Sequence, residues 1–342
     1  MEKYRVGIVG ATGMVGQRFI SLLKDHPWFE VNCVAASARS AGKTYREAVG
    51  ERWAFAWEIP EKVAGMTVVD AADIDEVSKH VDFVFCAVDM KKDEIRALEE
   101  AYAKHEIPVV SNNSACRGIE DVPMVVPEIN ADHLAVIEAQ KKRLGTKTGF
   151  IAVKPNCSIQ SYVPALTPLL DFEPEKVSVC TYQAISGAGK TFKTWPEMVD
   201  NVIPYIGGED EKSENEPLKL WGHVEDGKIV NAALPVISAQ CLRVACSDGH
   251  MAAVSVSFKK KPTIEQIKER WANYETEAQR LELPSAPKPF LQYFEAPSRP
   301  QTRLDRDFQN GFGVSIGRLR EDSIFDWKFV GLAHNTLRGA AG

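Results

Sequence analysis

The feature that most constrains the fold is a regular alternation of apolar runs and helical stretches in the N-terminal part of the chain. Strand-length apolar runs occupy residues 5–9, 31–36, 83–88 and 108–111, and helical stretches occupy residues 15–24 and 91–104. Because parallel strands need a long connection, which is usually a helix, this order predicts an α/β domain with a parallel sheet. A chain of 342 residues is long enough for about two domains, and we assign residues 1–154 to the first.

The rest of the sequence has a different pattern. After an apolar run at 150–153, longer strands are predicted at 176–185, 240–245 and 251–258, and an amphipathic helix at 264–278. These elements predict a second, α+β domain over residues 155–331. Two segments of that domain are predicted to be loops, namely the acidic, polar segment 207–216 and the segment 281–300, which carries five prolines.

Composition excludes several classes of function. The chain has 41 Lys and Arg against 47 Asp and Glu and no basic run, so nucleic acid and acidic membrane surfaces are not expected partners. No stretch approaches the ~20 apolar residues of a membrane span, and residues 1–5 lead into a strand rather than a signal-peptide core. The seven cysteines are scattered without a Cys-x-x-Cys pair, so neither a disulfide framework nor a zinc site is predicted. We expect a cytoplasmic protein without a metal.

Glycines at positions 10, 13 and 16 lie between the first strand and the first helix. Small residues there let backbone N–H groups and the helix N-terminus approach a pyrophosphate, which predicts a Rossmann-type, doubly wound dinucleotide-binding domain. The second strand ends at Ser37, Arg39 and Ser40, where an NAD-binding protein usually has an acidic residue. A cation with hydroxyls fits a 2′-phosphate, so we predict NADP(H), with a solvated Arg39 as the alternative.

A candidate nucleophile, Cys157, follows the apolar strand 150–153. A cysteine at the N-terminus of a helix has a lowered thiol pKa and favours the thiolate, although a buried structural cysteine fits the spacing equally well. Pro164 and Pro168 predict that the following helix is kinked or displaced. A strand end and glycine turn bring Arg243 and His250 to one neighbourhood, which favours a Cys–His pair.

In order and combination, these motifs resemble the aspartate-β-semialdehyde dehydrogenases over the whole chain, and the archaeal and fungal branch most of all. The matching segments are 10–16, 36–43, 111–117, 126–130, 155–158, 182–189, Arg243 with His250, and 334–341. Two positions beside the nucleophile depart from the family pattern: Lys154 stands where many relatives have Asn, and Ile159 where many have Thr.

The resemblance implies a role for each matching residue. Cys157 would be the acyl-accepting nucleophile, His250 the acid/base, and Gln183 would orient the acyl intermediate. Arg117 and Lys212 would hold the phosphate, Arg243 the α-carboxylate and Glu209 the α-ammonium, with Asn113 also at the substrate. Cofactor contacts would come from Gly10, Thr12, Gly13, Met14, Val15, Ser37, Arg39, Ser40, Ser186, Gly187 and Asn335. The segment 332–342 would complete the NADP-binding domain, and 155–331 would serve catalysis and oligomerisation.

The implied reaction is the NADPH-dependent reduction of L-aspartyl-4-phosphate to L-aspartate 4-semialdehyde and phosphate through a Cys157 thioester, in aspartate-family amino-acid biosynthesis, by a homodimer or homotetramer. Malonyl-CoA reductase and N-acetylglutamyl-phosphate reductase are alternatives that share the Cys–His pattern. Glu209 argues against both, since neither acyl group carries a free α-ammonium. An NADP-sensing regulator without turnover is the alternative from another class, and the joint presence of Cys157, His250, Arg243, Arg117 and Gln183 disfavours it.

Overall fold

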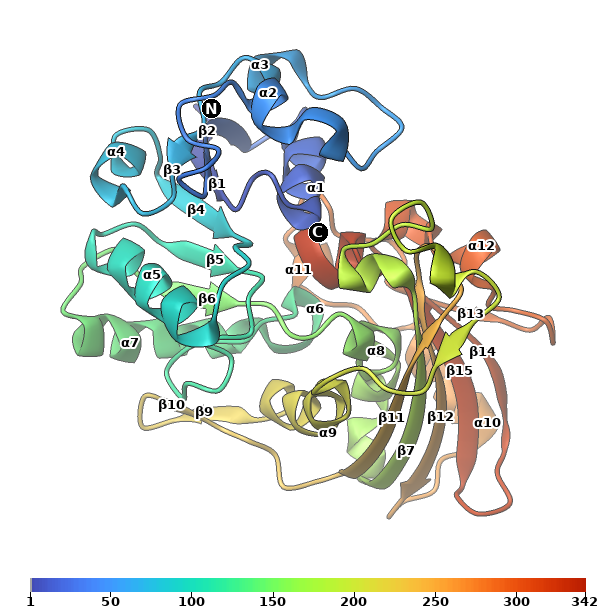
Figure 1. Cartoon of the computed structure of the whole chain (residues 1–342). Helices are drawn as coiled ribbons and strands as arrows, with labels where there is room; N and C mark the ends of the chain where they lie inside the picture. Colours follow the sequence, from blue (N-terminus) through green and yellow to red (C-terminus); the bar gives the residue numbers. More distant parts are fainter. Residues whose placement is uncertain (1) are drawn as a thin grey trace.

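The computed structural model describes residues 2–342 and contains two large sheets (Figure 1). The first is six-stranded, with the order β3-β2-β1-β4-β5-β6, and every neighbouring pair is parallel. Its strands are β1 (Tyr4–Val9), β2 (Phe29–Ala36), β3 (Val69–Asp70), β4 (Phe83–Cys86), β5 (Val109–Ser111) and β6 (Ile151–Val153). The strand order reverses between β1 and β4, which confirms the predicted doubly wound, Rossmann-type sheet.

Helices cover this sheet because its strands are apolar on both faces. They are α1 (Met14–Leu23), α2 (Tyr45–Val49), α3 (Glu61–Ala64), α4 (Ile74–Ser78), α5 (Lys92–Lys104), α6 (Pro127–Asn130) and α7 (Ile137–Leu144). On one face, Phe19 and Ile20 of α1 are buried in a cluster with Val6 and Ile8 of β1. This packing fixes the start of α1 at the end of β1, where the glycine segment lies.

The second sheet is seven-stranded and mixed, with the order β13-β14-β15-β12-β7-β11-β8, which confirms the predicted α+β domain. Its strands are β7 (Pro174–Gln183), β8 (Val202–Ile203), β11 (Val236–Val244), β12 (His250–Phe258), β13 (Leu291–Phe294), β14 (Val314–Glu321) and β15 (Trp327–Ala333). Strand β7 pairs parallel with β11 and antiparallel with β12. Trp271 of α10 (Ile264–Ala272) packs against Phe329 of β15 and so fastens this helix to the sheet.

Both loop predictions for this domain need correction. Most of the segment 207–216 lies in α9 (Glu209–Leu220), a helix that packs against β11. Its three consecutive acidic residues stand in the first turn, where negative charge is favourable beside the helix N-terminus. The proline-rich segment 281–300 contains β13, an edge strand that pairs parallel with β14. The predicted helix 264–278 ends at Ala272, and α11 (Glu277–Arg280) begins separately after it.

The chain after Cys157 is broken into short turns of helix, as its prolines predict. These are η3 (Ser158–Ser161), α8 (Val163–Leu166) and η4 (Thr167–Phe172), and Pro164 and Pro168 stand in the first turns of the last two. Cys157 therefore precedes a four-residue 3-10 turn rather than a long helix. A turn of that length carries only a weak dipole.

The segment after β15 returns to the first domain and ends in η8 (Leu337–Ala341), which packs against α1 and η3 (Figure 1). Arg338 makes a bidentate ion pair with Glu128 of α6, with both N–O distances at 2.9 Å. Both side chains are buried. Arg18 of α1 donates to the Thr336 hydroxyl at 3.1 Å. The segment thus ties both domains together beside the nucleophile.

Candidate active site

A cavity of about 780 Å³ lies at the carboxyl ends of β1, β2 and β4. Six of the residues predicted to bind the cofactor line it, namely Gly10, Thr12, Gly13, Ser37, Arg39 and Ser40. Gly10 has a φ of +90°, and a Cβ there would lie 2.4 Å from the Ala87 carbonyl oxygen. A Cβ at Gly16 would likewise meet the Gly10 carbonyl oxygen at 2.4 Å, so side chains at these two positions would push apart the backbone segments that pack closely at the start of α1.

The same cavity contains charged residues that the sequence analysis missed. Lys43 and Arg52 line it together with Arg39, and three cations suit a phosphate-rich ligand. Asp70 and Asp89 also line it. Two other predicted cofactor residues, Met14 and Val15, begin α1 and are absent from the lining of this cavity.

The candidate nucleophile and the candidate acid/base are neighbours. Cys157 Sγ lies 3.4 Å from His250 Nε2. The backbone N–H of Ala184 donates to His250 Nδ1 at 3.0 Å, so the neutral ring carries its proton on Nε2, facing the sulfur. Burial, reinforced by the positive charge of Arg243, places the pKa of His250 well below its ordinary value. The ring is therefore neutral near pH 7 and can donate from Nε2.

The prediction that a helix N-terminus lowers the Cys157 pKa is wrong. Burial raises the pKa of this thiol, because a thiolate loses solvation in the protein interior. The positive charges of Lys154, Arg117 and Arg243 act in the opposite direction. The thiolate at this site therefore depends on neighbouring cations rather than on a helix dipole.

Lys154, one of the two departures from the family pattern, is itself part of the site. Its ammonium group donates to the Pro155 carbonyl oxygen at 2.9 Å and to the carbonyl oxygen of Gly339 in η8. Burial lowers the pKa of Lys154 to about 8. Gly339 in turn backs onto the nucleophile, since a Cβ at that position would lie 2.9 Å from the Cys157 Cβ.

The first residue of α9, Glu209, is buried beside residues 154–157, the loop between β6 and η3 that carries Cys157 and is called the nucleophile loop below. Its carboxylate accepts from Asn156 Nδ2 at 2.9 Å, from Lys212 Nζ at 2.8 Å and from Gln183 Nε2 at 3.3 Å. Burial acts to raise the pKa of Glu209, but these contacts outweigh it and the net shift is downward. A carboxylate held in this way can receive an ammonium group.

Arg243 and the predicted cofactor residues of the second domain lie around His250. Arg243 Nη1 donates to the Ala184 carbonyl oxygen at 2.7 Å. A Cβ at Gly187 would come within 2.9 Å of that same nitrogen and 3.0 Å of the His250 ring. Asn335 Nδ2 donates to the Ser186 hydroxyl at 2.9 Å. The positions of the Arg243 and His250 side chains therefore need a residue without a Cβ at Gly187.

Arg117 is nearly buried and forms an ion pair with Glu216 of α9, with Nη1 and Oε1 at 2.8 Å. Sequence analysis did not identify Glu216, although it follows Glu209 and Lys212 at helical spacing. Asn113, predicted at the substrate, instead directs its side-chain amide to the buried Glu99, at 3.0 Å from Oε1.

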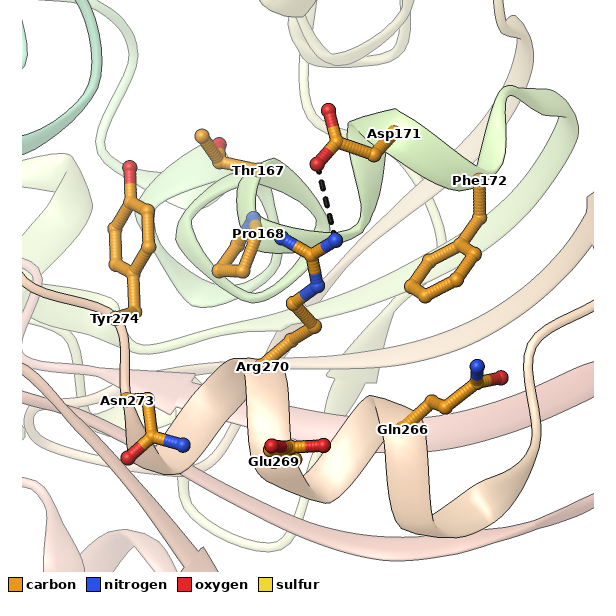
Figure 2. Close-up of a pocket in the computed structure, with 9 residues that line it drawn as sticks. All are labelled: Thr167, Pro168, Asp171, Phe172, Gln266, Glu269, Arg270, Asn273 and Tyr274. Atoms are coloured by element: carbon orange, nitrogen blue, oxygen red, sulfur yellow. Dashed lines mark ion pairs between the residues drawn. The ribbon is translucent and has the colours of Figure 1, made fainter.

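A separate hollow lies on the second domain between η4 and α10 (Figure 2). An Asp171–Arg270 ion pair of 3.1 Å crosses it, and none of the predicted site residues lines it. Within residues 2–342, no group of three or more His, Cys, Asp or Glu side chains is placed to hold a metal ion. No helix in the same range is long and apolar enough to cross a membrane.

Comparison with known proteins identifies the family. A family model described as "Semialdehyde dehydrogenase, NAD binding domain" matches residues 5–137, and one described as "Semialdehyde dehydrogenase, dimerisation domain" matches residues 166–338. The aspartate-semialdehyde dehydrogenase of Schizosaccharomyces pombe is 45% identical over 345 residues, covering 99% of this chain and 95% of the relative. The chain belongs to the aspartate-semialdehyde dehydrogenase family.

Archaeal and fungal aspartate-semialdehyde dehydrogenases are both similar to this chain, which confirms the resemblance drawn from the motifs. The enzyme of Archaeoglobus fulgidus is 43% identical over 342 residues, covering 99% of this chain and 95% of the relative. The crystal structure of the Candida albicans aspartate-semialdehyde dehydrogenase, determined with NADP, matches with a TM-score of 0.89 and 38% identity. It covers 100% of this chain, which spans 96% of that structure.

Proposed function

We propose that the chain catalyses the NADPH-dependent reduction of L-aspartyl-4-phosphate to L-aspartate 4-semialdehyde and phosphate, and the reverse oxidation. The observation that carries the proposal is the Cys157–His250 contact of 3.4 Å, with Arg117, Glu209 and Arg243 gathered around it. Glu209 has the charge to pair with the substrate ammonium, Arg243 with its carboxylate and Arg117 with its phosphate.

The cavity beside β1 fits an NADP molecule. Gly10, Thr12 and Gly13 line it just before the N-terminus of α1, and Arg39, Lys43 and Arg52 supply cations for the phosphates. NADPH, when bound, supplies the hydride. The fungal relative solved with NADP supports the same cofactor for this chain.

The chain's own residues account for the covalent step. The Cys157 thiolate attacks the acyl carbon, the carbon–oxygen bond to phosphate breaks, and a thioester remains on the sulfur. His250 holds its proton on Nε2 and donates a hydrogen bond to the oxygen that becomes negative on the attacked carbon. Hydride addition to the thioester carbon leaves a thiohemiacetal oxyanion on Cys157. Its collapse re-forms the carbonyl double bond and breaks the carbon–sulfur bond, which releases the aldehyde and returns the electron pair to the Cys157 sulfur.

The other reductases are less compatible with Glu209. A malonyl or N-acetylglutamyl group has no free ammonium, so the buried Glu209 carboxylate would lack a partner for its charge other than Lys212. A non-catalytic regulator would not need Cys157 and His250 within 3.4 Å of each other.

The test is an assay of the purified protein with aspartate semialdehyde, phosphate and NADP⁺, alongside Cys157→Ser and His250→Ala variants. Cys157→Ser should abolish turnover while NADP binding stays within a few-fold, because a serine hydroxyl is a far poorer nucleophile than a thiolate. His250→Ala should reduce the rate by about 10²–10⁴. Near-normal turnover by Cys157→Ser would eliminate the thioester mechanism, and faster reduction of malonyl-CoA than of aspartyl phosphate would eliminate the proposed substrate.

We also propose that the protein acts in the cytoplasm as a homodimer or homotetramer. Apolar side chains stay exposed on β7, β8 and β11 of the second sheet, with Tyr182 37%, Val202 54% and Val236 63% exposed. A surface of this kind suits a subunit contact. The family model that matches this region is described as a dimerisation domain.

A further inference from the structure

We propose that Glu216 is a positioning residue that couples the phosphate subsite to the nucleophile, an inference that rests on the proposed function. One carboxylate oxygen, Oε1, accepts from Arg117 Nη1 at 2.8 Å. The other, Oε2, accepts from the backbone N–H of Asn156, the residue before Cys157. A single side chain therefore joins the predicted phosphate ligand to the loop that carries the sulfur.

The bridge that Glu216 forms between Arg117 and Asn156 is largely shielded from water. The side chains of Arg117 and Glu216 are only 10% and 11% exposed. A guanidinium taken out of water needs an opposite charge, and Glu216 supplies it. Arg117 Nη2 also donates to the Asn112 carbonyl oxygen at 3.1 Å, so the guanidinium is held on two sides.

Arg117 nevertheless keeps a donor for a ligand. Its Nε is buried and has no hydrogen-bond partner among residues 2–342. A guanidinium has five N–H donors, of which Glu216 and Asn112 engage two. An arriving phosphate oxygen can therefore bind Arg117 while Glu216 stays in place, and the distance between phosphate and sulfur stays fixed.

A second residue of α9, Lys219, also holds Arg117, by a hydrogen bond to the Arg117 backbone carbonyl. Lys219 Nζ donates to the carbonyl oxygens of Arg117, Ile119 and Val122, at 2.7, 2.8 and 3.0 Å. Lys219 makes none of these bonds to the nucleophile loop. Glu216 and Lys219 therefore separate two effects, since both position Arg117 but only Glu216 also touches the loop before Cys157.

The chemistry of the bridge requires a carboxylate. Both partners, a guanidinium N–H and a backbone N–H, are donors, so the bridging group must accept twice. A glutamine has one acceptor oxygen and would direct its amide N–H₂ at the second donor. An aspartate also has two acceptor oxygens, but its carboxylate lies one methylene closer to the α9 backbone and should not reach both donors. Glu216→Gln and Glu216→Asp should both break the coupling.

The experiment compares the wild type with Glu216→Gln, Glu216→Asp and Lys219→Met. Glu211→Gln is the matched control, because it removes the same charge from an exposed position on α9. Each protein is assayed for the KM for inorganic phosphate and for kcat in the oxidative direction. The rate of Cys157 alkylation by iodoacetamide, with and without phosphate, is followed by mass spectrometry, and the melting temperature is recorded.

Glu216→Gln should raise the phosphate KM and lower kcat, for a combined loss in kcat/KM of about 10²-fold, as expected when reacting groups are displaced by about 1 Å. It should also change the Cys157 alkylation rate in the absence of phosphate. Lys219→Met should raise the phosphate KM and leave that alkylation rate unchanged, and Glu211→Gln should behave as the wild type.

The proposal is overturned if a folded Glu216→Gln or Glu216→Asp protein keeps both the phosphate KM and the alkylation rate within two-fold of the wild type. It is also overturned if Glu216→Gln and Lys219→Met give the same pattern, because the contact with Asn156 would then contribute nothing. If the wild type does not oxidise aspartate semialdehyde, the proposed function fails, and alkylation with and without phosphate still decides the role of Glu216.

Discussion

The charge on Lys154 should set the reactivity of Cys157, and replacing it tests this directly. Burial raises the pKa of the Cys157 thiol, and Lys154 is the first of the positive charges that oppose the rise. A neighbouring opposite charge typically moves a pKa by about 1–3 units. Lys154→Met keeps an unbranched side chain as far as Cε but removes the charge, so the thiolate fraction at pH 7 should fall by about 10- to 1000-fold.

The pH dependence makes the prediction specific. Lys154 has a pKa of about 8, lowered by burial, so its charge is present at pH 7 and is lost as the pH rises through about 8. The advantage of the wild type over Lys154→Met should therefore be large at pH 7 and shrink above pH 9. Lys154→Arg keeps a guanidinium that stays charged throughout this range, so any advantage it retains should persist at high pH.

The assay is the rate of Cys157 alkylation by iodoacetamide from pH 6 to pH 9.5, read at the Cys157 peptide by mass spectrometry. Lys142→Met, at an exposed position on α7, is the matched control. Superimposable pH profiles for Lys154→Met and the wild type would show that the Lys154 charge does not act on Cys157. Loss of the Lys154→Arg advantage over Lys154→Met between pH 7 and pH 9, as in the wild type, would show that titration of Lys154 is not the cause of the pH dependence.

Three further predictions concern the cofactor, the substrate and stability. Arg39→Ala should weaken NADPH binding by about 1.5–3 kcal/mol and NADH binding much less, and equal losses in titrations with the two cofactors would remove Arg39 from the 2′-phosphate. Glu209→Gln should raise the KM for aspartate semialdehyde and narrow its kcat/KM advantage over succinate semialdehyde, whereas unchanged discrimination would contradict an ammonium contact. Arg338→Met leaves the buried Glu128 carboxylate unpaired and should lower the free energy of unfolding by about 3–5 kcal/mol, measured as a lower melting temperature. Adding Glu128→Gln to the same chain should recover part of this loss, and an unchanged melting temperature in Arg338→Met would show that the pair does not stabilise the fold.

The sheet of the first domain was predictable because its signals are local. A buried parallel strand is a continuous apolar run, and the glycines at positions 10, 13 and 16 mark the turn into α1 without information from elsewhere in the chain. The break after Cys157 was equally local, since Pro164 and Pro168 cannot lie within one regular helix.

Helix α9 was missed because its sequence is that of a solvated loop. Its first turn is acidic, and Pro217 stands inside it. The buried stripe of Glu209, Ser213 and Pro217 has helical spacing but few apolar residues, so hydrophobic periodicity gave no signal. The charges are buried because they face Arg117 and the nucleophile loop, and that tertiary contact cannot be read from neighbouring residues. Glu216 was missed for the same reason.

The electrostatic environment of Cys157 also depends on tertiary contacts that the local sequence does not show. Its position after a strand was readable, but the sign of its pKa shift depends on burial and on Lys154, Arg117 and Arg243, which come from separate parts of the chain. Resemblance to a family supplied the roles of these residues. Only the folded geometry shows that cations, rather than a helix N-terminus, favour the thiolate.

The segment around η8 has a consequence for the order in which the protein matures during synthesis. Gly339 backs onto Cys157, Arg338 pairs with Glu128, and Thr336 is bound by Arg18, so these three partners are made long before the segment itself. The Rossmann-type sheet can fold as a unit while translation continues. The support that this segment gives to Cys157 is therefore added last, after the strands of both sheets have been synthesised. A partly made chain can fold its first sheet while Cys157 still lacks that support.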